Sequence, residues 1–374
     1  MATLKEALAT IIDPKIRHIV PISGGKDSAA LAVYMCLNYS QINVEYIFPS
    51  CSSQILSLLF MIPSLTYYKL KRYNLFHLHW TGSFNSPIKI LQPFYSWYFL
   101  FILKFLKLLD YKLIWTVHNL VPHEKLFVND LKYRQFLANL ADMKIVHSNS
   151  VIEEMDAIGI NAKNTHIIPI GNYAGLYENK ASKEEARKKL NLSHNDFVFL
   201  FFGNIRRYKG IECLLEAFER LSKNNGNVKL ILAGECGEPS LLKDINGYEK
   251  IMKNKLISHI YHIDDKDIQY YFNSADIIVF PFKKVTTSSS VLLAFAYSKP
   301  IIAPRIGCLN DIPKNTGFFY NSLKKNALYN TMNDAIKRKS ELNYLGKNAE
   351  IYSRSLSWDK ISEKTLDLYR RLIE

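Results

Sequence analysis

Short apolar runs rich in β-branched and aromatic residues alternate with helical patterns along the chain. Strands that alternate with helices in this way predict parallel sheets covered by helices, because parallel neighbours must be joined by a crossover. The runs fall into two sets, separated by a polar and charged stretch at 171–196. We therefore predict an α/β fold with a domain boundary near residue 172. The predicted strands are 16–22, 42–48, 75–80, 112–118, 144–148 and 165–170 in the first set, and 197–203, 228–234, 276–282 and 300–304 in the second.

The composition restricts the class of protein. A hydrophobic fraction of 48% with 22% charged residues is typical of a folded globular chain. The formal net charge of +14 indicates an anionic partner, and nucleic acid, anionic lipid and phosphorylated ligands all meet that need. The five cysteines lack the spacing of a zinc site, so we expect no metal and a reducing cytoplasm. The first residues lack the apolar core and cleavage site of a signal peptide.

The segment 93–112 raises the question of a membrane span. Lys104 and Lys107 interrupt its uncharged run, which is well short of the ~20 residues that cross a bilayer. We therefore predict that it does not span. Two interpretations remain, a packed helix of an α/β domain or a helix in the headgroup region with aromatics and lysines at the interface. In the second interpretation the apolar side consists of Trp97, Phe101 and Phe105.

A glycine and a group of basic residues follow the predicted strand at 197–203. The first amides of a helix are unpaired and lie at the positive end of its dipole, so anions bind where a strand leads into a helix. Arg206 and Lys209 add full charges at this place. The turn is therefore either an anion site or a solvated basic turn. The helix that follows has an apolar stripe that we expect in the core, made of Ile211, Leu214, Leu215, Phe218 and Leu221.

Three serines, Ser288, Ser289 and Ser290, open a predicted helix after the strand at 276–282. Small hydroxyl residues at such a position can simply cap the helix. They can also let phosphate oxygens reach the backbone amides, and ligands of open α/β sheets sit at the carboxyl ends of the strands. Both loops follow strands, so we expect the serines to share one anion site with the basic turn.

Five stretches of the second half follow one another as FGNIRRYKGIECLLEAF, LILAGEC, YFNSADIIVFPF, SSSVLLAFAYSKPIIAPRIGC and SWDKISEKTLDLYRRL. Together they resemble the nucleotide-sugar-binding domain of group 1 (family 4) glycosyltransferases, and LFHLHWTGSFNS and IWTVHNLVPHE resemble the acceptor-side domain of that family. The resemblance implies the GT-B fold, in which two Rossmann-like, doubly wound domains face a cleft. It places the acceptor domain at 51–172, the donor domain at 173–356 and a helix that crosses back to the first domain at 357–374.

The resemblance implies a donor site, with departures from the family pattern. The family holds its donor diphosphate with a basic pair in a G-x-x-x-x-x-K-G loop, in which Lys209 matches the lysine. Asn204 stands where many members have arginine, and Arg206 is the substitute. Many members also have an E-x7-E pattern, whose places are held here by Val285 and Leu293. The implied donor-binding residues are Gly203, Asn204, Arg206, Lys209, Gly234, Ser288, Ser289 and Ser290.

The serine loop resembles a branch of the family with the pattern S-G-x-x-x-L-A. Ser289 stands at the usual glycine, and Asp311 stands at a position often held by glutamate. The resemblance implies a nucleotide-diphosphate sugar as donor, retention of the anomeric configuration, and no required metal or cofactor. Arg206 and Lys209 would then act in catalysis by stabilising the charge on the departing diphosphate.

His118 ends a predicted strand of the first domain and is therefore expected at the ligand edge of its sheet. A lone histidine is often a structural residue, but the resemblance places this one near the reacting sugar, in a catalytic or sugar-orienting role. His123 and Glu124 are weaker candidates. His77 and His79 alternate along a strand and are weaker still.

The segment 1–50 contains a different motif. Its SGGKDS loop resembles the PP-loop of the ATP pyrophosphatase and phosphoadenosine-phosphosulfate reductase group, and INVEYIF resembles the next strand of that group. Glycines permit a nest of amides around pyrophosphate, and a lysine supplies charge. We interpret 16–48 as a β-α-β unit in the place of the usual first strand and helix of a glycosyltransferase. The implied phosphate site consists of Ser23, Gly24, Gly25, Lys26, Asp27 and Ser28.

We predict a hexosyltransferase that moves a sugar from a nucleotide-diphosphate donor to a glycan or polyprenyl-linked acceptor in surface polysaccharide synthesis. The alternatives are a PP-loop enzyme that uses ATP or reduces a sulfated nucleotide, and an inactive fused glycosyltransferase. The expected partners are the nucleotide sugar, the acceptor and an anionic membrane surface, with no nucleic acid. We expect a cytoplasmic protein, peripheral at the inner face of the membrane if the aromatic helix inserts.

Overall fold

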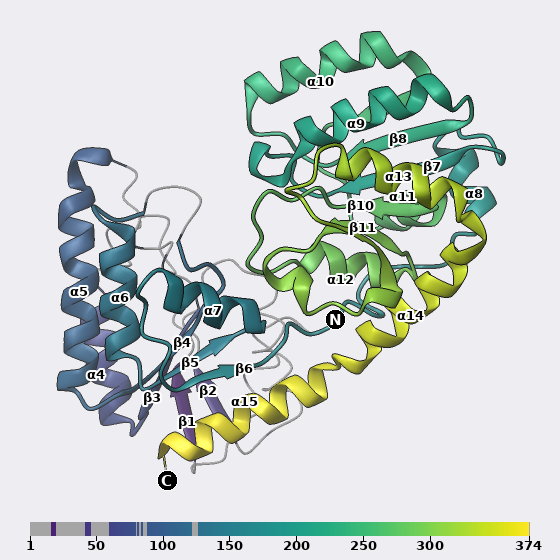
Figure 1. Cartoon of the computed structure of the whole chain (residues 1–374). Helices are drawn as coiled ribbons and strands as arrows, with labels where there is room; N and C mark the ends of the chain where they lie inside the picture. The colour runs from purple at the N-terminus through teal and green to yellow at the C-terminus, as the bar shows by residue number, and fades with distance from the viewer. Residues whose placement is uncertain are drawn as a thin grey trace. The chain divides into compact units, whose positions relative to one another are not determined.

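The structure is a computed structural model that describes residues 16–19, 42–45, 60–79, 81, 84, 88–121 and 126–373. For the first two of these stretches it describes the strand pairing alone. The chain forms two compact units (Figure 1). One runs up to Gly171 and takes in the residues from Trp358 onward, and the other runs from Asn172 to Ser357.

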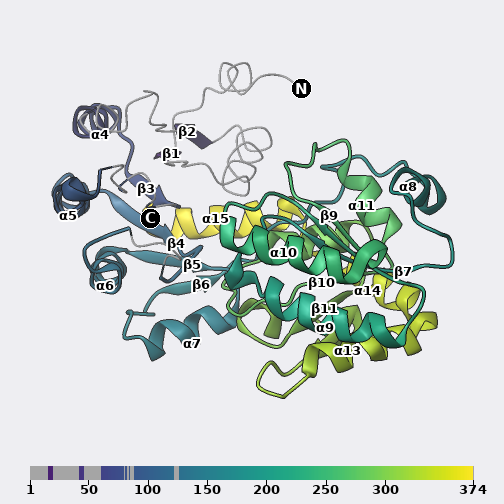
Figure 2. The ribbon, with the colours of Figure 1, turned by 90° about the horizontal axis from the view of Figure 1, so that it is seen from above.

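The first unit contains a six-stranded parallel sheet of order β2-β1-β3-β4-β5-β6. Its strands are β1 (Ile16–Ile19), β2 (Ile42–Glu45), β3 (Leu75–Leu78), β4 (Lys112–Thr116), β5 (Met143–Val146) and β6 (Thr165–Ile167). Its described helices are α4 (Met61–Leu70), α5 (Gln92–Leu108), α6 (Asp130–Leu140), α7 (Asn149–Ala157) and α15 (Trp358–Ile373). Figure 2 shows α4, α5 and α6 on one side of the strands and α15 on the other. Coverage on both faces explains why every residue of β3 is buried.

The second unit contains a six-stranded parallel sheet of order β12-β11-β10-β7-β8-β9. Its strands are β7 (Phe197–Phe202), β8 (Val228–Ala233), β9 (Leu256–His259), β10 (Ile277–Val279), β11 (Ile301–Pro304) and β12 (Gly317–Tyr320). Its α-helices are α8 (Lys183–Lys189), α9 (Ile211–Asn224), α10 (Pro239–Met252), α11 (Ile268–Ser274), α12 (Ser289–Ala296), α13 (Ala327–Lys337) and α14 (Leu342–Ser355). The chain winds outward from β7 to β9 and then outward from β10 to β12, so β7 and β10 form the switch point of the sheet.

The predicted α/β class is confirmed, and so is the core stripe of α9, in which all five predicted side chains are fully buried. Two strands were not predicted, β9 and β12. Both lie at the edges of their sheet and have four residues each. In β9 only Leu256 is buried, so the apolar signal that marks central strands is weak there.

The helix α5 has features of both interpretations of the segment 93–112. One side packs into the core of the first unit through residues such as Phe99 and Leu103. The opposite side exposes Phe94, Trp97 and Phe101, with 57% of Trp97 accessible. None of the described helices has the length and apolarity that a bilayer crossing requires. The predicted absence of a span therefore holds for the described part of the chain.

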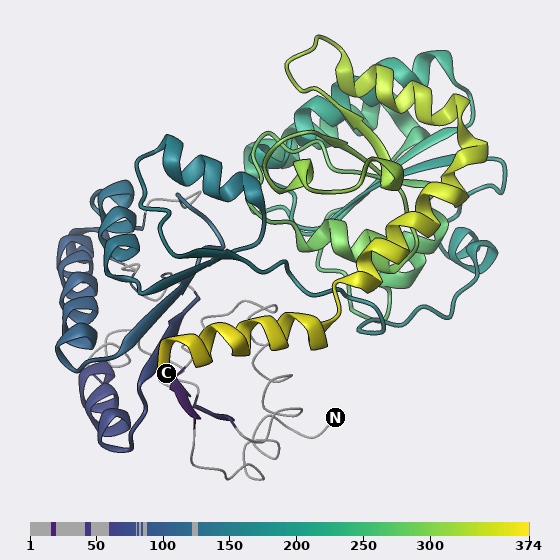
Figure 3. The same cartoon turned by 60° about the horizontal axis from the view of Figure 1, so that its bottom comes forward.

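The helix α15 follows the second unit in sequence and packs on the first unit (Figure 3). Near its start Trp358 lies against Gly171, where a Cβ atom would come within 2.4 Å of the indole. Near its end the hydroxyl of Tyr369 lies 2.5 Å from His77 Nδ1 in β3. These two contacts fasten both ends of the helix to residues of the first unit.

Candidate functional site

The predicted anion site of the second unit is assembled at the carboxyl ends of β7 and β10. A Cβ atom on Gly203 would lie 3.4 Å from Ser290 Oγ and 3.7 Å from Lys209 Nζ, so these three residues surround one small space. Gly203 has φ +118°, a backbone conformation that favours glycine. Because β7 and β10 are the switch point, this is where open parallel sheets bind ligands.

Gly234, at the end of β8, brings a second strand end to the same place. A Cβ atom there would lie 2.3 Å from the carbonyl oxygen of Gly203, so only glycine lets the two backbones approach. The structure thus brings Gly203, Gly234, Lys209 and Ser290 together, as the sequence predicted for a shared site.

The two adjacent arginines of this turn differ in their partners. The guanidinium of Arg207 forms salt bridges with Glu212, Glu238 and Asp244, so it is a structural residue. Arg206 instead lies over Gly237, where a Cβ atom would meet its guanidinium at 2.6 Å. Arg206 forms no salt bridge with any other residue that the structure describes. Its role in binding an anion stays a prediction.

Lys209 is the most perturbed cation of this site. Its ammonium makes no salt bridge among the described residues, and its recorded partner is the ring of Phe201, 6.0 Å from Nζ. Burial, followed by the positive charge of Arg206, lowers the pKa of Lys209 to about 8. A nearby anion would offset both effects, so the site is electrostatically prepared for a phosphate.

The serine loop opens α12 as predicted. Ser288 is the N-cap residue, but its side chain makes no capping hydrogen bond, so the simple capping explanation does not account for the serines. Val285 and Leu293 are buried apolar residues, which agrees with the absence of the paired glutamates at these places. Asn204 is exposed, and Asp311 ends the short 3-10 helix η5 (Gly307–Asn310).

In the first unit His118 belongs to a group of four histidines at the carboxyl ends of three adjacent strands. His77 and His79 come from β3 and its end, His118 follows β4, and His147 follows β5. His79 Nδ1 lies 3.3 Å from His118 Nε2, and His118 Nδ1 lies 3.4 Å from His147 Nε2. His77, which the sequence analysis had treated as a weak candidate, is fully buried in the same group.

A backbone carbonyl sets the proton positions along this chain of rings. His147 Nδ1 lies 2.8 Å from the carbonyl oxygen of Ile168, which can only accept, so Nδ1 carries the proton. In the neutral ring His147 Nε2 then accepts from His118 Nδ1, and His118 Nε2 accepts from His79 Nδ1. Burial lowers the pKa of both His79 and His118 well below the ordinary value, and neighbouring histidines add to the effect. His79 and His118 are therefore neutral at physiological pH.

Sequence reasoning did not find three members of this network, namely Thr116, His147 and Tyr369. His77 Nε2 lies 2.7 Å from Thr116 Oγ1, and Tyr369 comes from α15. The signal for His147 was available, because each of the runs LFHLHW, KLIWTVH and KIVHS ends in or just after a histidine. In the described part of the chain no three His, Cys, Asp or Glu side chains are arranged as metal ligands.

Several predicted residues lie outside the described residues. These are His123, Glu124, and the PP-loop candidates Ser23, Gly24, Gly25, Lys26, Asp27 and Ser28.

Comparisons with known proteins agree on the class. Residues 182–352 match the family model described as glycosyl transferases group 1. Alpha-monoglucosyldiacylglycerol synthase of Acholeplasma laidlawii is 24% identical over 241 residues, 62% of this chain and 58% of that protein. Lipopolysaccharide 1,2-N-acetylglucosaminetransferase of Salmonella typhimurium is 22% identical over 234 residues, 60% of this chain and 61% of that protein. Residues 182–352 therefore resemble the group 1 glycosyltransferases, and both of these relatives are named as sugar-transferring or glycolipid-forming enzymes.

The alignments span about half the length of the curated relatives. Solved structures share the fold over nearly the whole chain. Sucrose-phosphate synthase from Thermosynechococcus elongatus superposes with a TM-score of 0.74 at 18% identity, covering 96% of this chain and 99% of that one. Anabaena HepE in complex with UDP superposes with a TM-score of 0.71 at 16% identity, covering 96% and 100%. These neighbours have the GT-B fold, as predicted from the sequence motifs.

Proposed function

We propose that the protein is a glycosyltransferase that binds a nucleotide-diphosphate sugar at the carboxyl ends of β7 and β10. The observation that carries this proposal is the meeting of Lys209 and Ser290 beside Gly203, with Lys209 half-buried and without a carboxylate partner among the described residues. Arg206 and Lys209 would hold the diphosphate and stabilise its negative charge as the sugar leaves.

The relatives named above support this donor class. HepE of Anabaena was solved with UDP and with UDP-glucose, and it shares the fold of this chain. The carboxyl end of the second sheet offers what such a donor needs: cations for the diphosphate, the N-terminus of α12, and glycines that allow close approach.

A donor screen by thermal shift tests the proposal. UDP-, GDP- and ADP-sugars are added to the full chain, and one of them should raise the unfolding temperature and be hydrolysed or transferred. ATP serves as the comparison, because release of pyrophosphate from ATP would indicate the PP-loop enzyme instead. If neither a nucleotide sugar nor ATP stabilises the chain, the inactive alternative is favoured.

We further propose that the first unit binds the acceptor, with His118 as a catalytic or sugar-orienting residue. Its support is the position of His118 at the end of β4 and the network that orients its ring through His147. A neutral imidazole suits a sugar hydroxyl better than a diphosphate, and a hydroxyl that donates to His118 Nε2 would replace the 3.3 Å contact of that nitrogen with His79 Nδ1. Substitution of His118 should therefore reduce transfer more than donor binding.

We also propose the reaction and its biological setting: hexosyl transfer with retention of configuration to a glycan or polyprenyl-linked acceptor, in surface polysaccharide synthesis. Two relatives are named for lipopolysaccharide or glycolipid sugar transfer, which supports such an acceptor. Linkage analysis of the product by NMR tests the anomeric outcome, since an inverted product contradicts retention.

We also propose that α5 docks on an anionic membrane surface at the inner face of the membrane. The support is its exposed aromatic side, in which Trp97 and Phe101 stack with ring centroids 5.7 Å apart, and Phe94 lies beside Trp97. Lys104 lies on the same exposed side of the helix. Aromatic rings and lysines on one helix side are typical of helices that lie in the headgroup region.

A further inference from the structure

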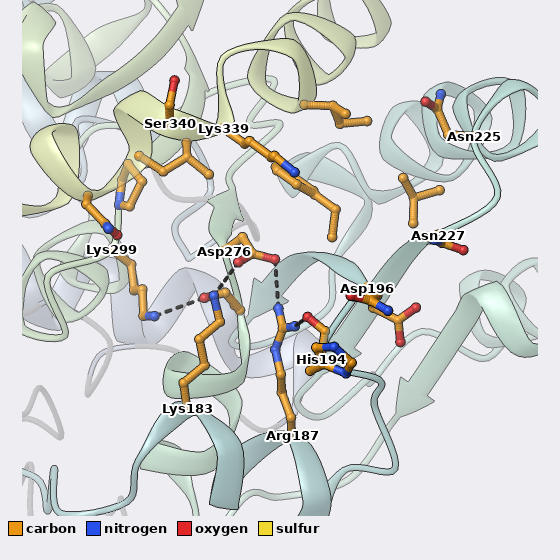
Figure 4. A pocket seen from close by; sticks show the side chains of 18 of the residues that line it. Lys183, Arg187, His194, Asp196, Asn225, Asn227, Asp276, Lys299, Lys339 and Ser340 are labelled. Atoms are coloured by element: carbon orange, nitrogen blue, oxygen red, sulfur yellow. Dashed lines mark hydrogen bonds and ion pairs between the residues drawn. The ribbon is translucent and has the colours of Figure 1, made fainter.

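A cavity of about 660 Å³ opens at the amino-terminal edge of the second sheet (Figure 4). It is lined by the residues that immediately precede β7, β8, β10 and β11, and by residues of α8 and of the 3-10 helix η7 (Lys339–Glu341). Parallel strands all start at one edge and end at the other. The cavity is therefore at the opposite edge of the sheet from the Lys209 site.

Positive charge predominates in the lining, which contains Lys183, Arg187, Lys299 and Lys339 against Asp196 and Asp276. The carboxylate of Asp276 is fully engaged. Its Oδ1 accepts from Lys183 Nζ at 2.5 Å, and its Oδ2 accepts from Arg187 Nη2 at 2.9 Å and from the amide of Val198 at 2.8 Å. Figure 4 shows Asp276 held between these two cations. It is therefore a structural anion with little capacity left for a third cation.

Lys299 is the cation that this arrangement leaves without a counter-ion. Its Nζ donates to the carbonyl of Ala275 at 2.9 Å and forms no salt bridge with a described residue. The side chain is half-buried. Burial is the main cause, and the charge of Lys183 the next, of a pKa lowered to about 8, with Arg187 acting in the same sense and Asp276 against it. Partial loss of water around an ammonium without an anion is costly, so an anion in the cavity would stabilise it.

The rest of the lining suits hydroxyl groups. Polar side chains come from Asn195, Asn227, Ser340 and Asn343, and Lys339 points toward the space in Figure 4. The volume falls in the range of small-molecule sites, about 300–1,000 Å³. A nucleotide would need an aromatic ring on which its base could stack. The lining contains Phe197, whose ring already packs against Phe199 at a centroid distance of 4.9 Å. The lining therefore favours a phosphorylated sugar over a nucleotide.

We propose that this cavity is a second ligand site, which binds a small phosphorylated sugar with its phosphate on Lys299 and its sugar toward Lys339 on the other side of the space. The site is separate from the donor site, since none of its lining residues belongs to the turn of Arg206 and Lys209 or to the serine loop.

Calorimetric titration of the full chain with glucose 6-phosphate tests this proposal. We expect one binding event per chain. Lys299→Gln should weaken it about tenfold or more, because it removes a charged hydrogen bond to phosphate. Lys339→Gln should weaken it less, because it removes a positive charge of the lining that does not contact the phosphate. The control Lys337→Gln, an exposed lysine of α13 outside the lining, should leave the affinity unchanged. Lys209→Ala should also leave it unchanged.

Three outcomes overturn the proposal. The first is no binding at millimolar glucose 6-phosphate in low salt. The second is binding that is lost in Lys209→Ala and kept in Lys299→Gln, which would place the ligand at the donor site. The third is equal affinity for inorganic phosphate and glucose 6-phosphate, which would mean a simple counter-ion site. If Lys299→Gln fails to fold, as judged by circular dichroism, Lys339→Gln decides, because Lys339 is exposed.

Measuring the protons taken up on binding adds a second test, because a lysine with only a structural role would not change this uptake. At pH 8 a part of Lys299 is neutral, and Lys183, Arg187 and Asp276 are the charged groups that act on it. A bound phosphate raises the pKa of the lysine, so binding should take up a fraction of a proton. Titrations in two buffers of different ionisation enthalpy measure this uptake. It should disappear in Lys299→Gln, and uptake that persists in that variant contradicts the assignment of Lys299.

Discussion

The two units place polar side chains at the same edge of similar parallel sheets, and the two groups have opposite electrostatic character. At the end of β7 the second unit holds Lys209 beside Arg206 with no carboxylate partner among the described residues. At the ends of β3 and β4 the first unit holds His79 and His118, which burial keeps neutral. A shared architecture therefore gives one cationic edge and one neutral edge, because the side chains at the strand ends and their partners differ.

The largest predicted effect is a loss of stability of the first unit at acidic pH, which the histidines of that unit cause. Below about pH 6.5 the unfolded chain binds protons at His79 and His118, whereas the folded unit keeps both neutral. The free energy of unfolding of the first unit should therefore fall by about 1.4 kcal/mol per histidine for each pH unit, until the folded rings also bind protons. Urea unfolding followed by tryptophan fluorescence measures this, because all four tryptophans belong to the first unit.

A matched pair of variants makes that measurement specific. His118→Phe should reduce the slope with pH by about one histidine, about 1.4 kcal/mol per pH unit. His262→Asn removes an exposed histidine of the second unit and should leave the slope as it is. An unchanged slope in His118→Phe would mean that the histidines do not set the acid sensitivity.

The next prediction tests the cationic edge. Lys209→Ala should weaken binding of the nucleotide-diphosphate sugar by about 1.5–3 kcal/mol, the contribution of a charged hydrogen bond. In the unchanged chain the affinity should also fall as the pH rises through about 8, since the donor binds the protonated lysine. Calorimetry checks both effects, and Lys223→Ala, a surface lysine paired with Glu219, is the control. Equal affinity in the Lys209 variant would reject the site.

A smaller effect is expected from the exposed aromatic side of α5, which we propose binds an anionic membrane. Each lysine near an anionic bilayer adds about 1 kcal/mol, and this contribution decays with salt. Co-sedimentation with anionic vesicles should show binding that a Trp97→Ser, Phe101→Ser double variant weakens at every salt concentration. Tyr344→Ser, an exposed aromatic of the second unit, is the control. Absence of pelleting at low salt, or an unaffected double variant, contradicts docking by α5.

The smallest predicted effect is that of substituting Lys26. A phosphate site at Lys26 would contradict the contrast between a cationic second unit and a neutral first unit. Lys26→Ala should leave sugar transfer nearly intact, because we interpret this segment as a replacement for the usual first strand and helix. Transfer assays with the purified variant check this. A collapse of transfer in a variant that still folds would show that the SGGKDS loop takes part in the reaction.

Local patterns made the candidate site of the second unit easier to predict than that of the first, although both unpredicted strands, β9 and β12, belong to the second unit. Lys209 and Ser290 were found because each stands a few residues after an apolar strand, so the sheet itself brings them together. The different roles of Arg206 and Arg207 depend on their side-chain partners, which the local sequence does not reveal. Tyr369 lies 292 residues from His77, and no periodicity in a sequence connects them.

The attachment of α15 to the first unit has a consequence for synthesis on the ribosome. Residues 172–357 form a continuous body that can fold as soon as it has emerged, and the amide of Asn172 bonds the carbonyl of Leu356 at 2.9 Å. The first body emerges earlier but lacks Trp358 and Tyr369 until translation has passed both. The first unit is therefore synthesised first but should complete its folding last. Until then Gly171 and His77 lack their contacts with Trp358 and Tyr369.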